Sequence, residues 1–135
     1  MMSVSFAVRR GGPTDADEIA AAHIDSIVSI GAGHYDPDIV SDWSAHKNGE
    51  LYLNAMAYGE SFYVAVETQA GGSEVLGFSS HCIRNDQHRI AVYVRGKVAR
   101  CGIGSALFQA AEATAIAAGA TSIHVAASLA AIEFL

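Results

Sequence analysis

The sequence predicts a single α/β domain, residues 1–135, in which helices cover a mixed β-sheet. The chain is long enough to bury a core of its own, since 51% of its 135 residues are hydrophobic and 16% are charged. Three short runs rich in β-branched and aromatic residues follow one another across tight turns, which is typical of an antiparallel meander. The last run leads through an alanine-rich segment into another apolar run, which predicts a β-α-β unit with parallel strands.

The first part of the chain is predicted to hold one strand and then helices. Residues 5–9 form the strand, and Thr14 or Asp15 is expected to cap the helix that follows. One buried face of this helix is predicted by four residues at three- and four-residue spacing: Ile19, His23, Ile27 and Ile30. Residues 31–37 are expected to end it, and shorter helices are expected at 37–43 and 51–58.

The rest of the chain is predicted to complete the sheet. The meander strands are expected at 61–67, 74–83 and 88–94. A helix over 103–118, ended by Gly119, is predicted by an apolar stripe of Ile103, Leu107, Ala110, Ala111, Thr114 and Ala117. A strand over 122–127 and a helix beginning at Ser128 give the order β-α-α-β-β-β-α-β-α.

Composition and charge exclude several classes of protein. The formal net charge of −6 argues against non-specific nucleic-acid binding, which needs a basic surface. No apolar run approaches the roughly 20 residues that a membrane span requires, and the N-terminus lacks a signal-peptide pattern, so we expect a cytoplasmic protein. Cys82 and Cys101 form no disulfide framework or zinc spacing and the six histidines are scattered, so we expect buried thiols and no metal site.

Half of the cations gather before a pair of glycines. Four of the eight lie between positions 89 and 100: Arg89, Arg95, Lys97 and Arg100. In an acidic chain this grouping indicates a local anion site, and the alternative is a solvated strand end.

The glycine pair itself follows an apolar strand that ends at Val94 and precedes a helix that begins at Gly102 or Ile103. The first turn of such a helix has unpaired backbone N–H groups and partial positive charge. Gly102 and Gly104 remove the side chains that would keep a ligand away, so the sequence predicts a seat for phosphate or pyrophosphate. A tight turn without a ligand is the alternative. The P-loop and dinucleotide patterns do not fit, because Ser105 follows Gly104 and Leu107 stands at the third glycine position.

The segment "VYVRGKVARCGIGSALF", residues 92–108, resembles the acetyl-CoA-binding motif of the GCN5-related N-acetyltransferase (GNAT) family, which has the form Q/R-x-x-G-x-G/A. Residues 9–27, 33–43 and 126–135 are similar to other segments of the family, in the same order. The sequence departs from the pattern at Gly96, Ala99, Ala130 and Leu135. Leu135 stands where the family usually has the tyrosine that protonates the leaving thiolate. The final strand pair of the family is missing from the sequence, so we expect weak catalysis if Leu135 is the true end.

The resemblance implies that acetyl-CoA binds as a co-substrate, without a metal. The backbone of Arg100, Cys101, Gly102, Ile103, Gly104 and Ser105 would hold its pyrophosphate. Arg95 would add charge, and the main chain of Val92, Tyr93 and Val94 would pair with the pantetheine arm. The meander strand and strand 122–127 would separate there to admit the thioester.

The acetyl group would pass to a primary amine of a small molecule or peptide by direct attack in a ternary complex. That reaction needs a base, for which His81 and Glu67 are the candidates, each with a surface strand residue as the alternative. His124 is expected to be structural. The acceptor pocket would hold His23, His34, Tyr35 and Trp43, with core packing as the alternative.

Two alternatives to an enzyme stay open, a non-catalytic CoA-binding or assembly module and a scaffold whose loop binds nothing. We also expect a homodimer. Strand 122–127 would be an open edge beside an apolar patch of Leu129, Ile132, Phe134 and Leu135.

Overall fold

The computed structural model describes residues 5–34, 38, 48–68 and 74–127, and in these ranges it contains a five-stranded sheet in the order β1-β2-β3-β4-β5. The strands are β1 (Phe6–Arg10), β2 (Ser61–Glu67), β3 (Val75–Arg84), β4 (Gln87–Val94) and β5 (Ile123–Ala127). The first four strands pair antiparallel, and β5 pairs parallel to β4. The predicted mixed sheet, with its meander and its β-α-β unit, is confirmed.

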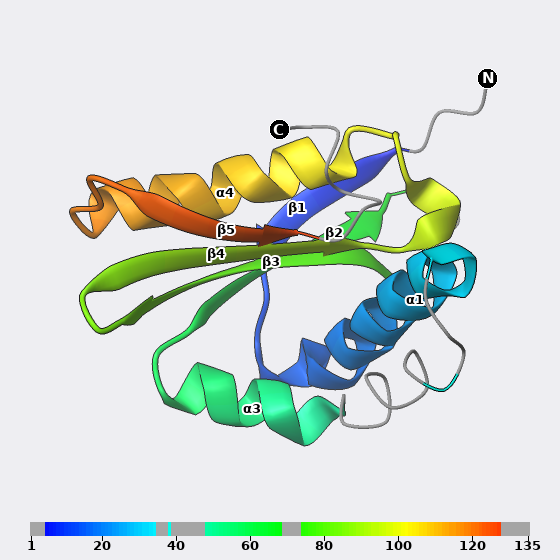
Figure 1. Ribbon diagram of the computed structural model, residues 1–135, viewed down its shortest axis with the longest axis horizontal. Coiled ribbons are helices and arrows are strands. Elements are labelled where there is room, and N and C mark those ends of the chain that lie inside the picture. Colours follow the sequence, from blue (N-terminus) through cyan, green and yellow to red (C-terminus); the bar gives the residue numbers. More distant parts are fainter. Residues whose placement is uncertain (1–4, 35–37, 39–47, 69–73, 128–135) are drawn as a thin grey trace.

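Helices cover both faces of this sheet (Figure 1). α1 (Ala16–His34) and α3 (Gly49–Ala57) lie on one face, and α4 (Ile103–Ala117) lies on the other. α1 reaches His34, the last residue described before 35–37, so the predicted end of this helix stays a prediction. The helices expected at 37–43 and from Ser128 lie outside the described residues, as do Tyr35, Trp43 and the side chain of His34.

α4 packs against the sheet through residues spaced four apart. Ile103, Leu107, Ala111 and Ala115 are fully buried against β3 and β4. The predicted stripe is therefore narrower than expected, because Ala110 and Thr114 are half-buried and Ala117 is exposed at the last residue of the helix.

α1 packs on the opposite face through small residues. Ala20, Ala22 and Ser26 are buried beside Ile19, whereas Ile27 and His23 are only partly buried. The buried face of α1 therefore differs from the predicted one. It consists largely of short side chains, which let the helix approach the sheet closely.

The start of α1 corrects the predicted cap. Pro13–Asp15 form a 3-10 turn whose N-cap is Gly12. The Asp15 carboxylate accepts the Gly12 N–H at 2.9 Å and pairs with the Arg9 guanidinium at 2.8 Å. These bonds, that of Arg9 foremost, hold the pKa of Asp15 below its usual range. Asp15 thus reaches back from the third position of the turn, as in a capping box.

The thiols of Cys82 and Cys101 are free, and both residues are partly buried where full burial was expected. Cys82 lies on β3, near the end of the meander hairpin, where its face of the sheet is hollowed.

Candidate functional site

The connection from β4 to α4 presents backbone N–H groups at an open surface. Arg100 (φ +67°) and Gly102 (φ +83°) both adopt left-handed backbone conformations before the helix begins at Ile103. The first backbone hydrogen bond of α4 runs from the N–H of Ala106 to the carbonyl of Gly102 at 3.2 Å. The N–H groups of residues 103–105 therefore have no acceptor within the helix, at its positive end. A Cβ at Gly102 would meet no described residue within 4 Å, so this part of the chain leaves room for a ligand at the turn. This turn suits an anionic group.

The cation cluster predicted before this turn is not assembled around it. The guanidinium of Arg95 is buried, where its Nε donates to the carbonyl of Val75 at 2.7 Å. Lys97 pairs with Glu74 at 2.5 Å. Arg89 lies at the opposite end of β4, about 20 Å from Arg95 along an extended strand.

The Arg95 guanidinium therefore points into the protein beneath the β4–α4 connection. The sequence predicts a contact with phosphate for it instead. It pairs with two carboxylates of α1, Asp25 at 3.6 Å and Glu18 at 3.9 Å. A buried charge needs such partners, which explains the inward orientation. Arg100 lies within the turn itself.

The structure accounts for the glycine at position 96, where proline is common in the family that the sequence resembles. Its N–H donates to Asp25 Oδ1 at 3.1 Å, a bond that proline could not make. A Cβ at Gly96 would lie 2.6 Å from the Cβ of Ser29, so the connection lies directly against α1. The β4–α4 turn is therefore positioned by α1.

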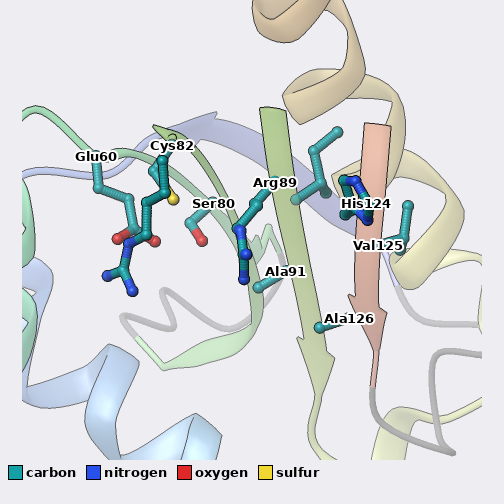
Figure 2. Close-up of a pocket in the computed structure, with 10 residues that line it drawn as sticks. Glu60, Ser80, Cys82, Arg89, Ala91, His124, Val125 and Ala126 are labelled. Carbon is teal, nitrogen blue, oxygen red and sulfur yellow. The ribbon is translucent and has the colours of Figure 1, made fainter. Parts of the chain in front are cut away.

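A cleft opens beside this unit, on the face of the sheet that carries α1 and α3. Its floor is a row of three small residues paired across three strands, Ser80, Ala91 and Ala126. The next row outward is polar, with Cys82 paired to Arg89 and Arg89 paired to His124. Small side chains leave a hollow of about 350 Å³ above the floor. In Figure 2, Glu60 and Cys82 lie on one side of Arg89, and His124 lies on the other.

The cleft continues into an aromatic chamber of about 230 Å³ under α1 and α3, with Ser80 and Ala91 in both linings. His23, the acceptor-site residue predicted on α1, lines this chamber. Its Nδ1 lies 2.5 Å from the Tyr52 hydroxyl, and its ring centroid lies 4.0 Å from that of Tyr93. Burial is the main cause that raises the pKa of both Tyr52 and Tyr93, so both hydroxyls stay protonated at neutral pH.

The two base candidates predicted from the sequence lie far from each other. His81 pairs with the first residue of β2, whereas Glu67 is the last residue of that strand. Because Ser80 and Cys82 line the cleft, strand alternation turns the buried His81 to the α4 face. Its Nε2 lies 2.9 Å from His88 Nδ1. Burial and the neighbouring His88 ring lower the pKa of His81. The catalytic roles of His81 and Glu67 stay predictions.

The structure brings to the cleft two charged residues that sequence reasoning missed. Glu60 lies just before β2 and lines three adjoining cavities, and Arg84 ends β3 and lines the same three. Alternation along β3 is a usable signal for Arg84, since residues 80, 82 and 84 share a face. The position of Glu60 depends on strand pairing, which the sequence pattern does not contain.

Comparison with known proteins shows the family. The acetyltransferase (GNAT) family matches residues 31–135, and the chain belongs to this family of transferases. No curated protein matches the sequence.

Solved structures share the fold. A GCN5-related N-acetyltransferase from Rhodopseudomonas palustris is 27% identical with a TM-score of 0.75, and the match covers 99% of this chain and 80% of that one. The PaiA N-acetyltransferase from Thermoplasma acidophilum, in complex with coenzyme A, is 20% identical with a TM-score of 0.72, covering 85% and 74%. A GNAT family acetyltransferase from Brucella melitensis, in complex with acetyl-CoA, is 20% identical with a TM-score of 0.64, covering 89% and 74%.

Two further findings concern the described ranges alone. No group of three or more His, Cys, Asp or Glu side chains there is arranged to hold a metal ion. No helix in these ranges is both long and apolar enough to cross a membrane.

Proposed function

We propose that the protein transfers an acetyl group from acetyl-CoA to a primary amine of a small molecule or peptide. The proposal rests on the β4–α4 unit. The N-terminus of α4 has backbone N–H groups without an acceptor in the helix, and β4, which precedes it, also forms part of the floor of the cleft. The complexes of the T. acidophilum and B. melitensis proteins with coenzyme A and acetyl-CoA support it.

The turn fits the phosphates of coenzyme A. The backbone of Arg100, Cys101 and Gly102 and the N–H groups of Ile103, Gly104 and Ser105, which have no acceptor within the helix, would hold the pyrophosphate, because a Cβ at Gly102 would meet no described residue within 4 Å. The pairing of β4 with β5 reaches Val92 and Ala127 in the described residues. The main chain of Tyr93 and Val94 beyond it is proposed to bind the pantetheine arm, with a Val94 N–H facing the acetyl carbonyl.

The cleft is proposed to hold the acceptor. Acetyl-CoA supplies an activated thioester, whose carbonyl carbon gains a bond to the amine nitrogen as its bond to sulfur breaks and the thiolate leaves. The amine must give up a proton before or during the attack, and Glu60 is the carboxylate that lines the cleft for this step. His23 and the Tyr52 hydroxyl line the wall behind it.

Calorimetry tests the phosphate seat. We expect binding of CoA, desulfo-CoA and adenosine 3′,5′-bisphosphate, and much weaker binding of NAD. Gly104→Asp places a carboxylate among the free N–H groups and is expected to abolish CoA binding, whereas Gly104→Ala adds no charge and retains part of the affinity.

Gln109→Asp is the matched control for this change, since it adds the same charge on an exposed position of α4 beyond the first turn. A folded wild-type protein that binds no CoA contradicts the proposed function. So does an equal loss of affinity in Gly104→Asp and Gln109→Asp.

We further propose that the enzyme is a homodimer joined at β5. The support is that β5 has β4 as its one neighbour in the described ranges, which leaves its other edge as a template for pairing.

A further inference from the structure

We propose that the acceptor is an amine that also carries a carboxylate, of about the size of an amino acid, and that Arg84 and Arg89 bind this carboxylate. The inference rests on the proposed function and concerns the outer part of the cleft. Arg84 ends β3, and Arg89 lies on β4 directly opposite Cys82. Both arginines line the 350 Å³ hollow beside the small-residue floor.

The two guanidinium groups are close to the same thiol. Burial and the charge of Glu60 raise the pKa of Cys82, and the charges of Arg84 and Arg89 act to lower it. Two arginines and one carboxylate therefore lie around this thiol, which leaves a local excess of one positive charge in a chain whose net charge is −6.

The charge of the Glu60 carboxylate reaches the same thiol, but within the described ranges no ion pair joins it to either arginine. The ion pairs found there join Arg9, Arg95 and Lys97 to carboxylates, and none includes Arg84 or Arg89. Arg89 donates a long bond of 3.4 Å to Gln87 Oε1. Guanidinium groups in such a position bind carboxylates in paired hydrogen bonds.

The opposite charge lies in the same cleft. Glu60 lines the same hollow from the residue before β2, on the side of Arg89 away from His124 (Figure 2), and it lines the aromatic chamber together with Arg84. An ammonium at Glu60 and a carboxylate at the arginines require a ligand that holds both groups a few bonds apart. The volume of about 350 Å³ is at the small end of ligand sites, which fits an amino acid.

Paired ligands test the proposal. Each of the common L-amino acids is compared with its own amide, which keeps the amine and the side chain and lacks the carboxylate. Binding is measured by saturation-transfer NMR without acetyl-CoA, and transfer is measured by release of free thiol. At least one amino acid is expected to bind and react about tenfold or more better than its amide, the usual gain from a hydrogen bond to a charged group.

Charge-removing variants assign the selectivity to the arginines. Arg84→Gln, Arg89→Gln and the double variant are expected to lose the preference for the acid by about tenfold, with little change for the amide. Arg10→Gln is the matched control, since Arg10 is an exposed arginine on β1. All three changed positions are exposed, so the thermal unfolding midpoint is expected to stay unchanged.

The inference is overturned if no amino acid is bound better than its amide, or if the preference survives in the double variant. Better transfer to diamines such as putrescine than to every amino acid overturns it as well. Coenzyme A binding is measured separately on the same samples. Its absence contradicts the proposed function, while the NMR comparison still decides the acceptor class.

Discussion

Glu60 faces the cleft from the residue before β2, with its carboxylate in three adjoining cavities. Glu60→Gln keeps the shape of this side chain and removes its ability to accept a proton. We expect kcat/KM for acetyl transfer to fall by about 10²- to 10⁴-fold, the usual contribution of a general base, with CoA affinity unchanged. Thiol release and calorimetry measure the two quantities.

Glu67→Gln and His81→Gln are the comparison variants, because both residues were base candidates from the sequence. Loss of activity in either of these variants, with normal activity in Glu60→Gln, would assign the base to the other position.

His81 makes the stability of the fold depend on pH. Its pKa is lower in the folded chain than the ordinary 6.5, chiefly because of burial and then because of His88. The unfolded chain therefore binds more protons between the two values, so the stabilisation is present above the ordinary pKa and is lost as pH falls through the folded one. We expect the melting temperature to drop between pH 7.5 and 5, and to drop less in His81→Gln. His124→Gln, at an exposed position of β5, serves as control, and equal pH profiles for all three proteins would contradict the assignment.

At the scale of elements, α1 positions the β4–α4 turn through Asp25, Ser29 and the buried Arg95. Gly96→Ala would place a Cβ 2.6 Å from the Cβ of Ser29. We expect a loss of about 1–3 kcal/mol in the free energy of unfolding, as for other overpacked sites, together with weaker CoA binding as the turn shifts. Denaturant titration and calorimetry measure the two effects.

A second-site change checks the cause. Ser29→Gly removes the atoms that the new methyl group would meet, so the double variant is expected to regain CoA affinity. Gly12→Ala is the control, because a Cβ at Gly12 meets nothing within 4 Å. No recovery in the double variant would show that the turn is not held by this contact.

At the scale of the whole molecule, β5 is the surface that we expect to join two copies of the chain. In the described ranges β5 pairs with β4 alone, and Val125 is 39% exposed. An exposed strand with one neighbour is a template for pairing, and a closed two-fold dimer is the commonest result.

Light scattering over several concentrations, up to tens of micromolar, measures the mass. We expect a dimer for the wild-type protein and a monomer for Val125→Lys. Ile116→Lys, at a 61% exposed position of α4, is expected to remain dimeric. A wild-type monomer at every concentration would refute this interface.

The sequence by itself determined the elements and most of their order. Residues 61–67 form β2 as predicted, and the tight turns fixed the antiparallel meander because short connections leave no other pairing. The glycine pair after an apolar strand also predicted the open turn before α4, since the left-handed conformation at Gly102 depends on a local residue choice.

Only the tertiary structure decided which side chains meet. Arg95 and Lys97 are close to the turn in sequence, yet their charges are taken up by carboxylates of α1 and by Glu74, which lies just before β3. The cleft is formed by single residues from different strands, such as Ser80, Ala91 and Ala126, that only strand register brings together. Register is a property of pairing between distant segments, and a shift of one residue would turn each of these side chains to the other face of the sheet.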